Sequence, residues 1–106
     1  MVDIRETVKS VVRWYAGSGR GLNTRVFPAL DDENQVYAVM DVLYPVRDDV
    51  AGVIVLVRIV GDKVVIEEDT TNRPIRDRLI EEGIPRENIV LVYAGEPIPD
   101  PERYAL

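Results

Sequence analysis

The sequence of 106 residues contains no cysteine and no histidine. The missing cysteines exclude disulfides, thiolate zinc sites and cysteine nucleophiles, and the missing histidines exclude every catalytic triad or metal cage that needs an imidazole. The sequence also lacks an apolar run of the roughly 20 residues that a membrane-spanning helix needs. Its first residues lack the basic and then apolar pattern of a secretory signal. We therefore expect a cytoplasmic protein whose chemistry is limited to carboxylates, hydroxyls, lysine and arginine.

Basic residues are scarce as well, because 13 Lys and Arg stand against 19 Asp and Glu, for a net charge of −6. A protein that binds nucleic acid usually carries a basic surplus that replaces counterions along the phosphates. Direct DNA binding is therefore disfavoured, although a local basic face remains an alternative. Its candidate residues are Arg20, Arg25, Arg73, Arg76 and Arg78.

The hydrophobic content of 46% is enough to bury one modest core, which predicts a single domain over residues 1–106. Apolar residues at helical spacing predict a helix over residues 3–16 that ends at Gly17. Four strand-like runs follow, at residues 24–30, 35–44, 50–60 and 63–68. Pro74 starts a second predicted helix, which ends near Glu82. Residues 88–93 are a short strand or an extended segment, and residues 94–106 form a proline-rich extended arm.

This order of elements predicts an α+β two-layer fold, in which a four-stranded antiparallel meander carries an N-terminal and a C-terminal helix on one face. Two helices cover one face of such a sheet, so an apolar face is left open. The predicted interaction surface combines strand residues with the anchor of the arm: Tyr37, Val53, Val55, Val57 and Tyr104. We expect self-association, most simply as a dimer, or the binding of a partner protein.

Three consecutive carboxylates, Glu67, Glu68 and Asp69, lie in "VVIEEDTTNRPIRDRL". Strand alternation would place Glu67 and Asp69 on one face and Glu68 on the other. We interpret the segment as a strand end, a polar turn and a capped helix, with Asp69 and Thr71 as its defining residues. A metal-dependent enzyme that uses Asp41, Glu67 and Asp69 is the less favoured alternative. No motif for a cofactor is present, and Arg58 is expected to pair with Asp41 or to point into an interface.

The longer stretch "GDKVVIEEDTTNRPIRDRLIEEGIPRENIVL" resembles the signature region of the XisI-like family, the excision-controlling factors of a cyanobacterial nitrogen-fixation element. The family pattern is a strand and turn of the form "DGK-W-I--D-T", then a short helix and "GIP-EDIVL". The matching residues are Lys63, Ile66, Asp69, Thr71, Leu79, Gly83, Ile84, Pro85, Glu87, Ile89, Val90 and Leu91.

The resemblance implies an α+β domain that acts with a partner protein, XisH, and with a site-specific recombinase in DNA excision. It implies no catalytic residue, so we expect a non-enzymatic regulatory protein. The family carries a tryptophan near Leu43, a histidine near Leu56 and a tryptophan near Val65, and all three positions are aliphatic here. The chain therefore resembles a divergent member.

Overall fold

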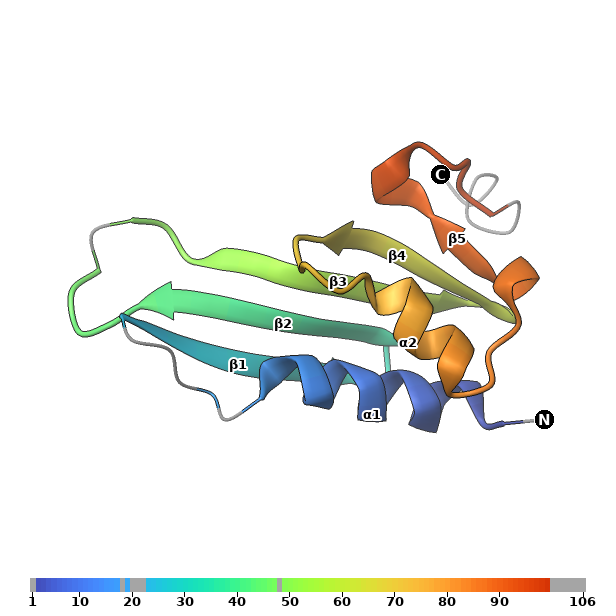
Figure 1. Cartoon of the computed structure of the whole chain (residues 1–106), viewed down its shortest axis with the longest axis horizontal. Helices are drawn as coiled ribbons and strands as arrows, with labels where there is room; N and C mark the ends of the chain where they lie inside the picture. Colours follow the sequence, from blue (N-terminus) through green and yellow to red (C-terminus); the bar gives the residue numbers. More distant parts are fainter. Residues whose placement is uncertain (1, 18, 20–22, 48, 100–106) are drawn as a thin grey trace.

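The structure, a computed structural model, describes residues 2–17, 19, 23–47 and 49–99. A five-stranded sheet in the order β1-β2-β3-β4-β5 carries two helices on one face (Figure 1), which confirms the predicted α+β class. The elements are α1 (Ile4–Ala16), β1 (Thr24–Asp31), β2 (Val36–Leu43), β3 (Gly52–Val60), β4 (Lys63–Asp69), α2 (Ile75–Glu81), the 3₁₀ turn η1 (Arg86–Asn88), β5 (Ile89–Leu91) and the 3₁₀ turn η2 (Val92–Ala94).

The sheet has one strand more than the sequence predicted. The four expected strands pair antiparallel in sequence order, and β5 then pairs parallel with β4, with Val64 opposite Ile89 and Ile66 opposite Leu91. A parallel neighbour needs a crossover connection, which α2 supplies. Because β5 is three residues long, its sequence pattern is too short to identify it as a strand.

The hydrophobic core lies between the helices and the sheet. From α1 it takes Val8, Val11 and Val12, and from α2 it takes Ile75 and Leu79. The predicted helix over residues 3–16 is confirmed, and its first turn is capped by the Asp3 carboxylate, which accepts from the backbone N–H of Glu6 at 3.0 Å. Neither of the two helices among the described residues has the length and apolarity to cross a membrane.

Two β-bulges determine which side chains share a face of the sheet. In β3, Val55 pairs with Val39 and Val53 pairs with Met40, so Ile54 is an extra residue without a partner on β2. In β4, Glu67 is the extra residue, because Leu56 pairs with Glu68 and Val57 with Ile66. Each bulge shifts the alternation by one residue and so moves the side chains beyond it to the opposite face.

The predicted interaction surface is wrong in three of its residues. Tyr37, Val55 and Val57 are fully buried in the core beneath the helices. The bulge at Ile54 places Val53 on the opposite face, where 38% of the residue is exposed. Simple alternation along the strand would have kept the three valines together, and the bulge separates them.

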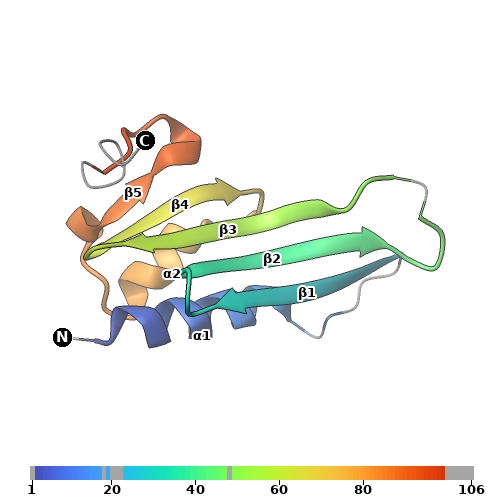
Figure 2. The same ribbon diagram turned by 180° about the vertical axis from the view of Figure 1, so that it is seen from behind.

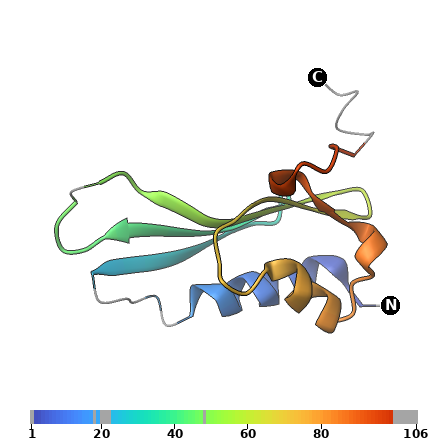
Figure 3. The ribbon, with the colours of Figure 1, turned by 45° about the horizontal axis from the view of Figure 1, so that its top comes forward.

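The face of the sheet without helices, which we call the open face, is turned toward the viewer in Figure 2. Its end near β4 is covered by the chain around η2, which lies on the side opposite the helices (Figure 3). Val65 is fully buried on this side. The described part of the predicted arm, residues 94–99, is held by Glu96, whose carboxylate accepts from the backbone N–H of Leu91 at 2.8 Å. The remainder of the arm, including Tyr104, lies outside the described residues.

Candidate interaction surfaces

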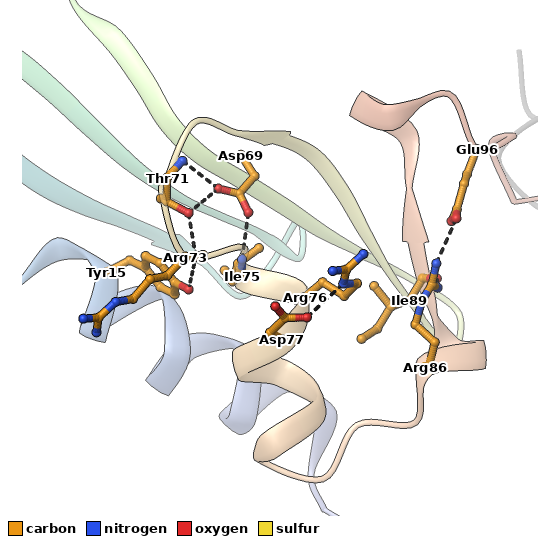
Figure 4. A network of polar contacts seen from close by, with 10 residues as sticks. All are labelled: Tyr15, Asp69, Thr71, Arg73, Ile75, Arg76, Asp77, Arg86, Ile89 and Glu96. Carbon is orange, nitrogen blue, oxygen red and sulfur yellow. Dashed lines mark hydrogen bonds and ion pairs between the residues drawn. The ribbon is translucent and has the colours of Figure 1, made fainter.

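The Asp69 carboxylate joins the end of β4 to the start of α2. Its Oδ1 accepts from the backbone N–H of Thr71 at 2.9 Å, and its Oδ2 accepts from the backbone N–H of Ile75 at 2.7 Å (Figure 4). The second bond satisfies an N–H in the first turn of α2, whose preceding residue, Pro74, has no side-chain hydrogen bond. The Asp69 carboxylate thus closes the polar turn before α2, whose N-cap residue is Pro74.

Thr71 and Tyr15 extend this network to α1. The Thr71 hydroxyl lies 2.6 Å from Asp69 Oδ1 and 2.7 Å from the carbonyl oxygen of Arg73. The Tyr15 hydroxyl donates to the same carbonyl oxygen at 2.5 Å. Burial raises the pKa of Tyr15, so the hydroxyl, which is protonated at neutral pH, stays protonated to a higher pH than an exposed tyrosine. The turn is thus fixed from both sides, by β4 and by α1.

The three consecutive carboxylates do not converge. Glu67 lies on the open face, where its Oε2 accepts from Arg58 at 3.0 Å (Nε) and 2.6 Å (Nη2), and the bulge turns Asp69 toward the helices. The expected sharing of one face by Glu67 and Asp69 is therefore wrong, and Arg58 pairs with Glu67 rather than with Asp41. Among the described residues, no group of three acidic side chains is placed to hold a metal ion.

The other residues of the quoted motif fix the path from α2 to β5. Gly83 follows α2 with a φ of +106°, a conformation that favours glycine, and Pro85 precedes η1. Lys63 Nζ donates to the carbonyl oxygen of Glu87 at 3.2 Å, joining the start of β4 to η1. Arg86 donates to the carbonyl oxygen of Ile89 at 2.7 Å and to Glu96 at 2.9 Å. These contacts give the motif residues structural roles.

A polar connection on the helical side joins α1 to the β1–β2 turn. Lys9 Nζ lies 2.9 Å from Asp32 Oδ2, and the Tyr37 hydroxyl donates to Asp32 Oδ1 at 2.9 Å. The hydrogen bonds from Lys9 and Tyr37 lower the pKa of Asp32. Burial, together with the bond to Asp32, raises the pKa of Tyr37 to about 12. Tyr37 is thus a buried side chain with a satisfied hydroxyl, not a surface residue.

A cleft of about 370 Å³ lies between the end of α1 and the start of α2, and we call it the helix cleft. Trp14 and Tyr15 line it from α1, and Arg73, Pro74 and Arg78 are among its residues on the other side. Trp14 is 44% exposed, and the Arg78 guanidinium lies 4.6 Å from the centre of its ring. The sequence analysis did not identify this site, although an aromatic residue that interrupts the polar face of a predicted helix was a usable signal.

The open face carries an apolar surface of different composition from the predicted one. Phe27, Met40 and Val53 lie side by side on β1, β2 and β3, and Ala29, Ala38 and Leu56 form the next row. Phe27 is 51% exposed, although it is large and apolar. We call these six residues the open-face patch. The predicted surface named Val53 among these six residues, and it grouped Val55 and Val57 with Val53 because the bulge in β3 has no sequence signal of its own.

The arginines proposed as a DNA-binding face do not form one surface. Arg25 lies at one end of β1, where its guanidinium is 3.7 Å from the centre of the Tyr44 ring. Arg76 pairs with Asp77 at 3.1 Å, and Arg78 lies 3.7 Å from Glu82, both on α2. Arg20 lies outside the described residues. The described arginines are divided between the two sides of the sheet, which disfavours a single phosphate-binding face.

Comparison with known proteins identifies the family. Residues 1–105 match the XisI protein family. The chain is a member of the XisI family. Its fold resembles the crystal structure of a XisI-like protein from Anabaena variabilis, with a TM-score of 0.73 and 27% identity over 82% of this chain and 81% of the other. It also resembles the fdxN element excision controlling factor XisI from the same organism, with a TM-score of 0.69 and 25% identity over 93% of each chain. No curated protein matches the chain.

Two of the three positions at which this XisI family member departs from the quoted family pattern lie on or beside the open face. Leu56 belongs to the open-face patch, and Val65 is buried next to it beneath the chain around η2. Leu43 is the last residue of β2 and is half-buried. The departures thus alter the apolar surface and leave the Asp69 network intact, which explains why the motif remains recognisable.

Proposed function

We propose that this chain is a non-enzymatic accessory protein in the excision of a DNA element and that it acts by binding a second protein of the XisH-like kind. The observation that carries this proposal is the family match over residues 1–105, together with a structural relative named an excision controlling factor. The polar side chains agree with such a role, because Asp69 and Glu67 are occupied by structural hydrogen bonds.

The helix cleft is the surface that we assign to this partner. Tryptophan and arginine are the side chains most enriched among residues that dominate binding energy at protein interfaces. In the cleft, Arg78 stacks on Trp14, and the Tyr15 hydroxyl is already occupied by Arg73. Both features hold the lining in one arrangement before binding, which lowers the entropic cost of association. The net charge of −6 favours a partner with a basic surface.

The test is co-purification of the tagged chain with an XisH-like protein from the same genome, followed by titration calorimetry. We expect a complex with the natural chain and a loss of about 2 kcal/mol, or roughly 30-fold in affinity, for Trp14→Ala. Tyr93→Ala is the matched control, because Tyr93 is also aromatic, is 40% exposed and does not line the cleft. Failure of the natural chain to bind any XisH-like protein would contradict the proposal. Equal losses for the two variants would remove the assignment to the cleft.

A further inference from the structure

The open-face patch is an apolar surface that none of the described helices covers. Its members come from three adjacent strands, so their side chains form a continuous area of two cross-strand rows. The helices lie on the other side of the sheet, and the chain around η2 covers the β4 end (Figures 2 and 3). Phe27 and Val53 remain 51% and 38% exposed. Such a patch marks an interaction site.

The charges around the patch are balanced within the chain. Alternation and the two bulges place three basic and three acidic residues on the open face of β1 to β4: Arg25, Arg58, Lys63, Asp31, Glu67 and Glu68. Arg58 is paired with Glu67, and Arg25 stacks on Tyr44. The open face of β1 to β4 is therefore neutral, although the chain carries a net charge of −6.

A neutral face favours a binding partner whose own contact surface carries little net charge. A basic or acidic partner would gain no complementary charge there, whereas two identical neutral faces do not repel each other. Two copies of the chain, each at −6, repel over the remainder of their surfaces. Contact between open faces is thus the arrangement in which self-association meets the least repulsion.

The β1 edge of the sheet is a poorer site for a second copy. At β1, the backbone N–H of Val26 already donates to the carbonyl oxygen of Gly19 at 3.0 Å. Pro28, two residues further along the same edge, has no N–H to donate. Both features block the extension of the sheet by hydrogen bonding to a further strand. A second copy is therefore expected to pack on the face and not to pair at the edge.

We propose that the open-face patch binds the same patch of a second copy, so that two sheets pack face to face with the helices on the outside. Three strands about 4.8 Å apart, over about four residues of about 3.4 Å each, give the patch a footprint of roughly 200 Å². A standard interface takes about 800 Å² from each partner. The association is therefore weak, with a dissociation constant in the range of about 1 to 100 μM. The helix cleft stays accessible, so this inference does not depend on the proposed function.

The first experiment is sedimentation equilibrium of the purified natural chain from about 5 to 500 μM. The expected result is a rise from the monomer mass of 12.0 kDa toward twice that value. Val53→Glu places a charge in the patch and should weaken the dimer at least tenfold. Ile80→Glu is the matched control on α2, because Ile80 is 40% exposed, and it should leave the dimer unchanged. A natural chain that stays monomeric at about 500 μM, or equal effects of the two variants, overturns the proposal.

A second measurement does not depend on disrupting the patch. The chain has no cysteine, so single-cysteine variants can be cross-linked cleanly with a short bis-maleimide. Met40→Cys, at the centre of the Phe27, Met40 and Val53 row, should yield covalent dimer at concentrations where the natural chain associates. Ile80→Cys on the helical side should not. Cross-linking at residue 80 that equals or exceeds cross-linking at residue 40 overturns the face-to-face arrangement.

Discussion

Removal of the Asp69 carboxylate is the perturbation whose cost the structure defines best. Three donors lie within hydrogen-bond distance of its oxygens: the Thr71 N–H at 2.9 Å, the Thr71 hydroxyl at 2.6 Å and the Ile75 N–H at 2.7 Å. A hydrogen bond to a charged group contributes about 1.5 to 3 kcal/mol, and loss of a helix cap costs about 1 kcal/mol. Because the residue is half-buried, water can replace part of this network. We expect Asp69→Ala to lower the free energy of unfolding by about 3 kcal/mol.

Asp69→Asn tests how much of this stabilisation needs both carboxylate oxygens. The amide keeps one acceptor oxygen, which can bond either to Thr71 or to the N–H of Ile75 but not to both in the present geometry. We expect a loss of about half that of Asp69→Ala, or roughly 1.5 kcal/mol. Urea unfolding followed by circular dichroism gives both values by linear extrapolation. Glu81→Ala, which removes an exposed acid from α2, is the control and should stay within about 0.5 kcal/mol of the natural chain. A loss below about 1 kcal/mol for Asp69→Ala would refute the assignment of Asp69 as the cap that joins β4 to α2.

Two further predictions concern Tyr37 and Gly83. Since the pKa of Tyr37 is raised from 10.0 to about 12, its neutral form stabilises the folded chain fully below about pH 10, and this stabilisation is lost as the pH rises toward 12. Tyr37→Phe should remove the last step of an ultraviolet tyrosine titration and flatten the fall in stability over that window; an unchanged titration would contradict the burial of the hydroxyl. Gly83→Ala should lower the free energy of unfolding by about 1 to 2 kcal/mol, because φ is +106° and a methyl group would lie 2.9 Å from Val2 Cγ1. If backbone strain dominates, Val2→Ala in the same chain will not restore stability, whereas recovery of most of the loss would show that the clash dominates.

The helices and the four long strands were predictable because each is set by a local pattern. The apolar spacing of α1 and the cap at Asp3 are features of the sequence within one or two turns. The sequence did not decide whether residues 88–93 form a strand or an extended segment, because the pairing of β5 with β4 depends on contacts across the crossover through α2. The helix cleft could not be predicted either, since Trp14 and Arg78 are brought together only by the packing of α1 beside α2.

The two β-bulges, each a single extra residue in a strand, determine which polar and apolar side chains lie on the same face of the sheet. With strict alternation, Glu67 and Asp69 would share a face, as a divalent cation site would require, and Val53 would be buried beside Val55. Glu67, the residue after Ile66, lies on the open face, where it meets Arg58, and the bulge at Glu67 then turns Asp69 toward the helices, where it bonds to the start of α2. The bulge at Ile54 directs Val53 outward, beside Met40. The same kind of irregularity therefore separates the acidic cluster and completes the apolar patch.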